Sequence, residues 1–512
     1  MKNKFYVTTP IYYVNAQPHL GHTYTTIAAD VLARYHRMIG DKTFFLTGTD
    51  EHGAKIEEKA GEAGMEPQQF ADAIAAKFML AWEELNISND SFIRTTYPAH
   101  KKAVQVAMQR MYDNGDIYKS KYEGLYCVGC EQFKNEKDLI DGKCPDHKIE
   151  PIWMSEEAYM FKLSKYQEPL LEKIKNDELK IRPIERKNEM ISFFGQVGLN
   201  DVAFSRTKVK WGIPVPWDES HTIYVWADAF LNYLTGLGWQ GEADEELEFW
   251  PAEVQLIGKD ILRVHTTIWP AMLLSLGLPV QKQLFTHGFF LSDGQKMSKS
   301  IGNVIAPEDL VKKYGVDGTR YLLMTATTFG NDGDITWKFL DEKYNADLAN
   351  GLGNLVSRVI TMAINGYESK IPAYSVSDLE QENKKQLMKF VKNEMENYVN
   401  AMGEISIDKA LSSAVRIISY LDKDITDLAP WKVLKNNGDD KLLMKNSFYS
   451  WLEAIRLIAW MIWPFMPEIA DKIWESLGLE NEKDNNFKKA IEWGRLEPGT
   501  QIKKPESLFP RI

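Results

Sequence analysis

Two short segments far apart in the chain carry residue types that suit phosphate chemistry. The first is His-Leu-Gly-His at residues 19–22, between an expected strand and an expected helix. His19 and His22 are three residues apart at a helix start, where both imidazoles can face one side and where unpaired N–H groups attract phosphate. Gly21 permits a nucleotide to approach the backbone closely. Alone, this loose pattern is equally well explained by two polar residues that cap a helix.

The second segment is Lys-Met-Ser-Lys-Ser at residues 296–300, in a loop between Gly294 and Gly302. The ammonium groups of Lys296 and Lys299 could close over a leaving pyrophosphate and stabilise charge that develops only in the transition state. Alone, a short basic turn is more simply a solvated surface feature. Chance does not explain the presence of both segments, in this order, in one chain.

All three cysteines lie between residues 127 and 144, which favours a metal over a disulfide framework. Cys127 pairs with Cys130 at CxxC spacing, and Cys144 pairs with His147 at the same spacing. Three thiolates and one imidazole make a closed tetrahedral zinc set, so the zinc would be structural and would stabilise a segment with a poor core. A redox dithiol is the alternative for the first pair, but the second pair and the lack of a βαβ context favour zinc.

Composition bounds the class of protein. A chain of 512 residues predicts about three domains, and 44% hydrophobic with 26% charged residues is typical of globular proteins. The net charge of -11 neither indicates nor excludes a nucleic-acid partner, because a local basic face suffices to bind phosphates. No apolar run could span a bilayer and no signal peptide precedes the first strand, so we expect a cytoplasmic enzyme without a membrane partner.

Strand and helix patterns alternate in the first part of the chain. A helix is predicted at 21–38, with Ile27, Val31, Tyr35 and Met38 on one face. Apolar runs predict strands at 4–9, 43–47, 224–226, 254–257 and 283–286, and further helices are predicted at 57–85 and 99–114. This alternation predicts an α/β fold with a Rossmann-like, doubly wound parallel sheet.

The later chain is helical, which predicts a separate all-α bundle. Its helices are expected at 347–365, 378–402, 407–428 and 447–463. The expected domains are the first half of the sheet domain at 1–116, an irregular insertion at 117–220 with the zinc knuckle at 126–148, the second half at 221–290, the lysine-loop region at 291–345, the helical domain at 346–480 and an extended tail at 481–512.

Further segments make the chain similar to the methionyl-tRNA synthetase family of class I aminoacyl-tRNA synthetases over essentially its full length. They are Thr-Pro-Ile-Tyr-Tyr-Val-Asn at 9–15, Gly-Thr-Asp-Glu-His-Gly at 48–53, Tyr-Val-Trp-Ala-Asp-Ala at 224–229, Ile-Gly-Lys-Asp at 257–260 and His-Gly at 287–288. Residues 19–22 and 296–300 resemble the two ATP signatures of the class. The zinc knuckle resembles the bacterial type with a single Cys₃His set.

The resemblance implies a two-step reaction. Methionine and Mg·ATP would give methionyl-adenylate and pyrophosphate, and the methionyl group would pass to the 3′-terminal adenosine of initiator or elongator tRNA(Met). Positioning and charge stabilisation would do the work, with no covalent nucleophile. The resemblance also implies one structural Zn²⁺, Mg²⁺ with ATP, a connective role for the insertion and stem contacts by 291–345. A monomer is expected, because nothing after the helices resembles the dimer-forming barrel of many relatives.

Roles for individual residues follow from the resemblance. Gly258 and Asp260 would hold the ribose and His287 would lie near the adenine, in one ATP site with His19, Gly21, His22, Lys296, Ser298 and Lys299. Asp50 would pair with the α-ammonium of methionine. The side-chain pocket would be lined by Ile11, Tyr13, Trp226, Ala229, Tyr233, Val264 and His265. Aromatic walls suit a thioether, although core packing is the simpler interpretation of Trp226 and Tyr233 taken alone.

Two positions depart from the family pattern. Val264 stands where many members carry an aromatic residue, and Phe230 stands where many carry a smaller one. One change removes ring volume and the other adds it, so the hypothesis is a repacked pocket.

The helical block also fits the resemblance. Asn354 and Arg358 lie four residues apart on one helix face, and Pro430 and Trp431 follow a helix. The resemblance implies that these four residues meet the CAU anticodon, where an indole can stack on an unpaired base and a guanidinium can bond a base edge. Trp431 could instead fill the helical core.

Two other functions stay open at this stage. A class I synthetase for cysteine would need zinc in its amino-acid pocket, and one for leucine, isoleucine or valine would need a larger editing insertion. A tRNA-binding or regulatory protein without catalysis would have broken signatures, whereas His19, His22, Lys296 and Lys299 are all present.

Overall fold

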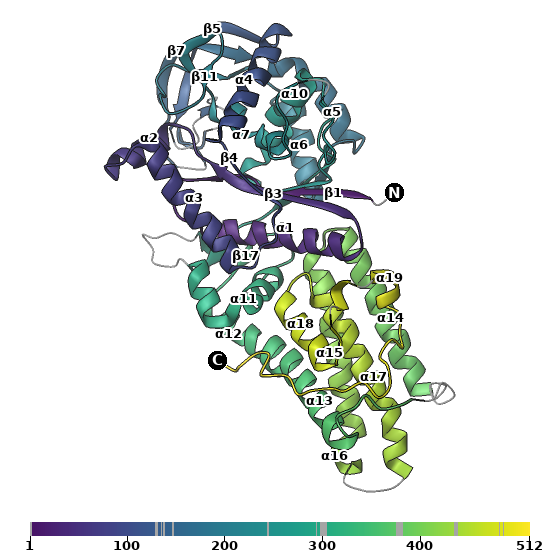
Figure 1. The fold of residues 1–512 in the computed structure, drawn as a ribbon. Helices are drawn as coiled ribbons and strands as arrows, with labels where there is room; N and C mark the ends of the chain where they lie inside the picture. The colour runs from purple at the N-terminus through teal and green to yellow at the C-terminus, as the bar shows by residue number, and fades with distance from the viewer. Residues whose placement is uncertain are drawn as a thin grey trace.

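The chain folds into an α/β lobe followed by a helical lobe (Figure 1). The computed structural model describes residues 3–128, 132–134, 136, 139–145, 148–242, 245–292, 294–296, 305–374, 382–434, 439–480, 482–484 and 486–512. Within these ranges, no helix is both long and apolar enough to cross a membrane.

A seven-stranded parallel sheet organises the α/β lobe. Its middle strand is β1 (Lys4–Thr8), which pairs with β3 (Lys42–Asp50) on one edge and with β13 (Val254–Gly258) on the other. Beyond them lie β14 (Gln283–His287), β8 (Lys180–Arg182) and β4 (Ser91–Arg94), and β2 (Tyr12–Tyr13) continues along β3 past the end of β1. The strand order reverses at β1, so the crevice at the carboxyl ends of these strands is where such a sheet binds ligands.

The first helix packs directly against this sheet. In α1 (Leu20–Met38), the predicted face of Ile27, Val31, Tyr35 and Met38 is buried. The prediction of one helix at 57–85 is wrong. The segment forms α2 (Ala54–Glu62) and α3 (Pro67–Glu84), because Gly64 adopts a φ of 66° after the first helix and Pro67 starts the second.

Further helices complete the α/β lobe. They are α4 (Pro98–Asp113), α5 (Gln167–Lys175), α6 (Ile184–Gln196), α7 (Val225–Ala229), α8 (Asn232–Thr235), α9 (Leu262–Thr266) and α10 (Ile268–Ser275). The strand predicted at 224–226 is wrong, since Tyr224 only precedes the one-turn helix α7. A three-residue apolar run cannot separate the two structures by its period.

The prediction of an irregular insertion over 117–220 is corrected in two ways. First, β5 (Ile117–Cys127) and β7 (Ile152–Phe161) form a long antiparallel ribbon, flanked by β6 (Gln132–Lys134) and β9 (Val202–Ala203). Second, β8 belongs to the central sheet and α6 packs against it. Strand β8 has only three residues, two of them charged, and so gives no apolar signal in the sequence.

Short strands and two helices connect the lobes. A small sheet of β10 (Ser205–Arg206), β11 (Pro214–Val215) and β12 (Asp218–Ile223) leads from the insertion to α7. After β14, the strands β15 (Phe290–Ser292), β16 (Gln295–Lys296) and β17 (Gly333–Asp334) pair, and α11 (Pro307–Thr325) and α12 (Trp337–Lys343) lead into the helical lobe.

The four predicted helices of the helical lobe are present. They correspond to the π-helix η4 (Tyr344–Gly353) with α13 (Asn354–Gly366), to α14 (Glu382–Gly403), to α15 (Ile407–Leu428) and to α17 (Asp439–Ile462). The structure adds α16 (Pro430–Val433) and α18 (Pro467–Ser476). The predicted tail also contains a short helix, α19 (Phe487–Ala490), and then returns along the lobe, where Gln501 pairs with Lys370.

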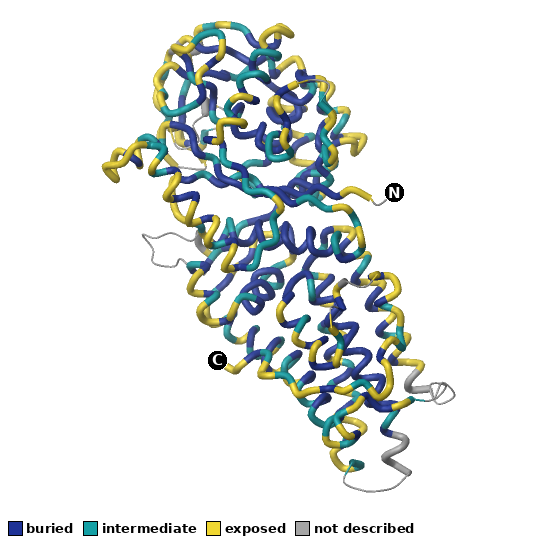
Figure 2. The backbone as a smooth tube through the Cα atoms, in the orientation of Figure 1, coloured by how far each residue is buried: buried dark blue, intermediate teal, exposed yellow. Residues whose placement is uncertain are grey.

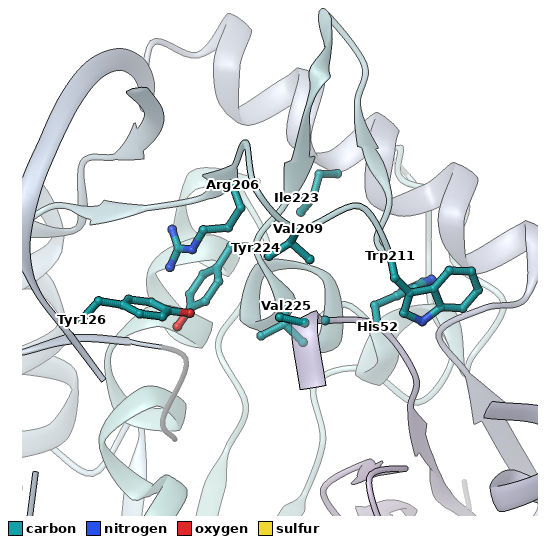
Figure 3. A pocket seen from close by; sticks show the side chains of 10 residues that line it. His52, Tyr126, Arg206, Val209, Trp211, Ile223, Tyr224 and Val225 are labelled. Carbon is teal, nitrogen blue, oxygen red and sulfur yellow. The ribbon is translucent and has the colours of Figure 1, made fainter. Parts of the chain in front are cut away.

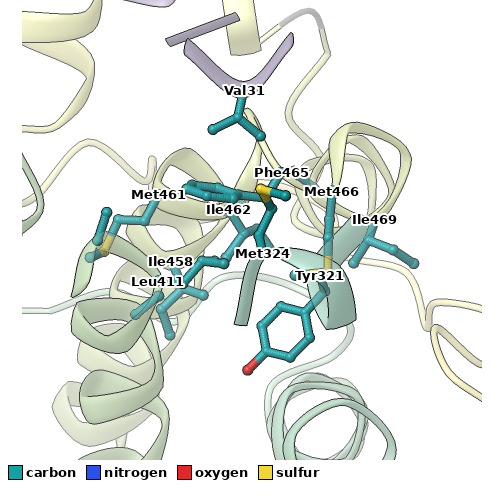
Figure 4. Close-up of a cluster of buried hydrophobic side chains, with 14 of the residues drawn as sticks. Val31, Tyr321, Met324, Leu411, Ile458, Met461, Ile462, Phe465, Met466 and Ile469 are labelled. Atoms are coloured by element: carbon teal, nitrogen blue, oxygen red, sulfur yellow. The ribbon is translucent and has the colours of Figure 1, made fainter. Parts of the chain in front are cut away.

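The two lobes share one hydrophobic core. Buried residues continue from the sheet through α1 into the helical lobe (Figure 2). At the junction, Val31 of α1 lies over a cluster that includes Met324 of α11, Ile462 of α17, and Phe465 and Met466 of the loop that follows (Figure 4). The lobes are therefore packed as one body at this junction.

A buried guanidinium lies in the same junction. The Arg320 side chain, from α11, donates from Nη2 to Asp30 Oδ2 of α1 at 2.6 Å and to the Pro464 carbonyl at 3.0 Å. Its Nε and Nη1 donate to the carbonyl groups of Phe465 and Leu85, at 2.7 and 3.2 Å. A single residue thus joins α1, the end of α3, α11 and the segment between α17 and α18.

Candidate active site

His19 and His22 cap the first turn of α1. The Nδ1 atom of His19 accepts from the Gly21 amide at 3.1 Å, and Nδ1 of His22 accepts from the His19 amide at 3.4 Å. The capping alternative therefore describes what these residues do in the structure. It also sets their chemistry, because a neutral imidazole that accepts through Nδ1 carries its proton on Nε2, where N–H is a donor suited to phosphate oxygen.

The environment of His22 keeps its imidazole neutral. The two imidazole rings stack with centroids 3.6 Å apart, and the rings of Tyr12 and Phe78 lie 4.6 and 5.3 Å from His22. Burial, and then the electrostatic interaction with His19, lower the pKa of His22 well below its ordinary value. Sequence reasoning missed Tyr12 and Phe78, although Tyr12 lies within the matched segment at 9–15.

Residues predicted for the nucleotide lie at the carboxyl ends of neighbouring strands. Gly258 ends β13, and a Cβ atom there would lie 2.6 Å from Oδ1 of Asp260, so glycine permits the close approach of this carboxylate. His287 ends β14 and faces α1, where its Nε2 accepts from the Thr25 hydroxyl at 2.6 Å. Its Nδ1 donates to the Gly288 carbonyl at 2.9 Å, and burial lowers its pKa to about 4. Thr25, one turn beyond Gly21, was missed by sequence reasoning.

The predicted methionine pocket begins at the end of β3. Asp50 is the last residue of that strand and is in register with Tyr13 of β2, so the predicted ammonium partner and one predicted wall residue are adjacent. A separate hydrophobic cluster lies within the α/β lobe and contains Val264 and Tyr233, and Ile11 is partly buried against it. Because β3 and β13 run parallel to β1, Asp50 and Gly258 lie at the same, carboxyl edge of the sheet.

Aromatic rings gather around His265. Its Nδ1 donates to the Ile261 carbonyl at 2.9 Å and its Nε2 accepts from the Tyr233 hydroxyl at 2.8 Å, and burial lowers its pKa to about 4. The ring of Trp226 meets His265 edge-on at 6.2 Å, and Phe230 meets it at 5.0 Å. The ring of Phe230 also lies 5.2 Å from Trp226, and Phe230 and Val264 belong to the same buried cluster.

A small hollow opens beside this pocket (Figure 3). Its walls come from the end of β3, from β5 and from the segment around β10 to α7. The guanidinium of Arg206 lies 4.5 Å over the Tyr224 ring and 5.7 Å over that of Tyr126. His52 and Trp211 form the opposite wall, with ring centroids 5.4 Å apart. Sequence reasoning missed this hollow, because it depends on contacts between segments that are distant in the chain.

The lysine loop is described only at its start. Strand β16 pairs Lys296 with Leu291, and Gly294 adopts a φ of 70° in the turn before it, where its amide donates to Asp334 Oδ2 at 2.8 Å. The side chain of Lys296 and the predicted residues Ser298 and Lys299 lie outside the described part of the chain.

Two of the four predicted zinc ligands are described. Cys127 ends β5 and Cys144 follows the short bridge between Ile140 and Lys143, and both cysteines are buried. The Cys144 carbonyl accepts from the Lys148 amide at 2.7 Å. Cys130 and His147 lie outside the described residues, and within the described ranges no group of three or more His, Cys, Asp or Glu residues could hold a metal.

Two of the four predicted anticodon residues, Arg358 and Trp431, are in contact in the helical lobe. The Arg358 guanidinium of α13 lies 4.9 Å over the ring of Trp431, which is 41% exposed. Pro430 is buried at the start of α16, and Asn354 is exposed at the start of α13. The alternative that Trp431 fills the helical core is therefore wrong.

Known proteins resemble this chain along its whole length. The family model described as tRNA synthetases class I (M) matches residues 5–150 and 137–360, and the model described as anticodon binding domain of methionyl tRNA ligase matches 376–512. The methionine–tRNA ligase of Caldanaerobacter subterraneus subsp. tengcongensis is 43% identical, over 100% of this chain and 79% of its own. That of Streptomyces coelicolor is 42% identical, over 99% of this chain and 96% of its own.

Solved structures of methionyl-tRNA synthetase also resemble this chain over its whole length. Mycobacterium tuberculosis methionyl-tRNA synthetase in complex with methionyl-adenylate is 37% identical, with a TM-score of 0.93 over 100% of both chains. The apo form of the M. tuberculosis protein is 34% identical, with a TM-score of 0.86 over 100% of this chain and 99% of its own.

Replacement of His287 by glutamine is expected to reduce the loss of stability in mild acid. Folded His287 has a pKa of about 4, whereas an unfolded histidine has a pKa of about 6.5. Between these two pH values only the unfolded chain binds the proton. The free energy of unfolding is therefore full above pH 6.5 and falls as the pH is lowered through this window. The free energy of unfolding falls by about 1.4 kcal/mol per pH unit for each such histidine. Urea unfolding at pH 7.5, 6.0 and 5.0 measures this slope.

The test compares the parent with the variant, because the titration of Asp317 changes the stability of the fold in the opposite direction. Burial raises the pKa of Asp317 to about 6, which stabilises the fold as the pH falls. Equal pH slopes for the parent and for His287→Gln would contradict a neutral, buried His287.

Proposed function

Because the chain belongs to the methionyl-tRNA synthetase family, its reaction is the ATP-dependent joining of methionine to tRNA, and we propose how its residues divide this work. One observation carries the proposal. The α1 cap and the carboxyl ends of the parallel strands β3, β13 and β14 carry His19, His22, Asp50, Gly258 and His287, so five of the predicted residues come from one edge of the sheet, which supports the proposal. We also place the enzyme in the cytoplasm, as a monomer.

The ATP site is proposed at the start of α1. His19 and His22 present Nε2–H groups beside the positive end of the helix dipole, and together with the Gly21 backbone they would hold the phosphates. Gly258 and Asp260 would hold the ribose, where a carboxylate accepts from hydroxyl groups, and the buried His287 would lie beside the adenine. Mg²⁺ bound with ATP would neutralise phosphate charge during the reaction.

Methionine is proposed to lie across the ends of β2 and β3. Asp50 would pair with the α-ammonium, and the thioether would lie among Trp226, Ala229, Tyr233 and His265. Because Nε2 of His265 is already satisfied by the Tyr233 hydroxyl and the imidazole is neutral, this end of the pocket presents an apolar surface. A polarizable sulfur makes favourable contacts with such rings. Ile11, Tyr13 and Val264 complete the lining.

Catalysis then requires only positioning and charge stabilisation. The methionine carboxylate attacks the α-phosphate in line, the bond to the β-phosphate breaks, and pyrophosphate leaves with the electron pair. Lys296, Ser298 and Lys299 would stabilise the charge that develops on the leaving group. In the second step, the 3′-terminal ribose hydroxyl of tRNA attacks the methionyl carbonyl and AMP leaves.

Replacement of Lys299 by alanine is expected to slow adenylate formation about 100-fold or more, because a donor aimed at developing charge is lost. Since Lys299 would not touch methionine, the KM for methionine should change less than threefold. Methionine-dependent ATP–pyrophosphate exchange measures both values, and exchange with cysteine, leucine, isoleucine and valine should be far weaker. Lys59→Ala, on the exposed face of α2, is the control. Equal effects of Lys299→Ala on rate and on KM would contradict the assignment.

The anticodon is proposed to bind where Arg358 lies over Trp431. The outer face of this half-exposed indole can stack on an unpaired base, and Asn354 and Arg358 offer groups for base edges. Pro430 holds the turn that presents Trp431.

Replacement of Trp431 by alanine is expected to raise the KM for tRNA(Met) about 10- to 100-fold, the cost of one lost stacking contact. Pyrophosphate exchange without tRNA should be unchanged, because the site is remote from the sheet. Leu428→Ala, an equally exposed neighbour at 41%, is the matched control and should leave both values unchanged. Slower exchange in Trp431→Ala would show that the residue acts through the fold instead.

One structural zinc is proposed in the insertion. Cys127 and Cys144 are buried, although neighbouring apolar residues such as Ile140 and Trp153 are 65% and 68% exposed, so this segment has little core of its own. Two buried thiols, with Cys130 and His147 as the other ligands, match the donor set that zinc prefers. The metal would hold the tip of the β5–β7 ribbon.

The purified protein is expected to contain one zinc per chain by atomic emission. Cys144→Ser should release it and make the insertion sensitive to protease, because binding supplies folding free energy there. Lys143→Ala, which removes the adjacent charge but no ligand, should keep the metal. A full zinc complement in Cys144→Ser would rule out this site.

A further inference from the structure

The carboxylate of Asp228 is enclosed between two imidazoles beneath the methionine pocket. Its Oδ2 lies 2.7 Å from Nδ1 of His52, and its Oδ1 lies 2.8 Å from Nε2 of His100. The second nitrogen of His100 lies 2.7 Å from the Thr235 hydroxyl. Asp228 is 0% exposed, and both imidazoles are almost fully buried. We call these four residues the Asp228 clamp.

The clamp satisfies its groups only when Asp228 is ionised. A carboxylate accepts and does not donate, so both imidazoles donate to it and each oxygen has a fixed partner. Burial alone would raise the pKa of Asp228, but the two imidazoles hold it at about 2. A charge buried in this way is costly to leave with a missing partner, which makes the arrangement rigid.

Each residue of the clamp comes from a different segment, and three of these segments carry proposed methionine contacts. His52 is two residues after Asp50, at the end of β3. Asp228 lies in α7 between Trp226 and Ala229. Thr235 lies in α8, two residues after Tyr233, and His100 of α4 joins this helix to Asp228. The clamp therefore connects the proposed ammonium site to the proposed side-chain pocket without lining either.

A similar carboxylate elsewhere shows what a purely structural network looks like. Asp116 is 2% exposed and accepts from Lys165 and Tyr166, both at 2.6 Å, and from Ser275 at 2.8 Å. These partners tie the start of β5 to α10 and to the segment before α5, and none of them borders a predicted site residue. Asp116 is thus a matched comparison for Asp228.

We propose that Asp228 is a positioning residue that sets the separation between Asp50 and the pocket walls Trp226, Ala229 and Tyr233, and thereby selects an amino acid of the length of methionine. The proposal rests on the methionine pocket proposed above. A difference of one methylene is worth only about 1–3 kcal/mol in an apolar pocket, so discrimination depends on walls that do not move. A displacement of 1 Å in bound geometry costs about 100-fold in rate.

The test is Asp228→Asn. An amide offers one acceptor and one donor, so it cannot accept from both imidazoles, and α7 loses one of its two anchors. We expect the KM for methionine in pyrophosphate exchange to rise at least tenfold, with the KM for ATP within twofold. The preference for methionine over ethionine, which is longer by one methylene, should fall at least fivefold. Asp116→Asn should lower thermal stability without changing either quantity.

Milder variants keep the test decisive if Asp228→Asn does not fold. Thr235→Val removes only the hydroxyl that holds His100, and should raise the KM for methionine two- to fivefold, whereas Thr235→Ser should restore the parental value. Unchanged selectivity in the Thr235 and Asp228 variants, or equal changes in Asp116→Asn, would overturn the proposal.

A third variant separates this proposal from the pocket itself. Trp226→Ala should raise the KM for methionine strongly if the pocket is correctly placed. If it does not, the proposed pocket is wrong. If Trp226→Ala has this effect while the clamp variants do not, the pocket stands and the positioning role of Asp228 is wrong.

Discussion

The geometry of the ATP site depends on how firmly α1 is held, and a buried guanidinium at its middle holds it. Arg320 bonds Asp30 of α1 and three backbone carbonyls from α3 and the α17–α18 connection. A planar fork of five donors can satisfy such a set only in one orientation. Because His19 and His22 lie at the start of the same helix, the helical lobe contributes to their placement although it is remote from them.

The two halves of the site use opposite physical environments. The proposed nucleotide half is a helix N-terminus with the neutral imidazole of His22, where N–H groups and the helix dipole would face the ligand. The proposed methionine half is an aromatic enclosure in which polar atoms such as Nε2 of His265 are satisfied by neighbours. We propose that the reaction takes place where the two halves meet, at Asp50 and the carboxyl end of β1. A charged ligand end and an apolar side chain can therefore be bound a few ångströms apart.

Sequence reasoning succeeded where a pattern is local. Strands β1, β3, β13 and β14 have continuous apolar runs, and α1 has a clear helical face, so the parallel sheet could be predicted. The prediction failed where an element covers too few residues to show a sequence pattern. Strand β8 has three residues and α7 one turn, so their type is decided by the sheet and the pocket around them. The partners of His265 and Asp228 also depend on contacts between distant segments, which no spacing rule encodes.

The strand order has a consequence for the synthesis of this protein. Strand β1 is made first, but its second neighbour β13 begins only at Val254, so the middle of the sheet stays open along one edge until roughly half of the chain exists. At typical rates of chain elongation this takes roughly 10 to 50 seconds. During that time the apolar run of Phe5, Tyr6 and Val7 offers unpaired backbone groups to any other strand. The nascent chain is thus expected to need a chaperone at its first strand, long before its last helix is made.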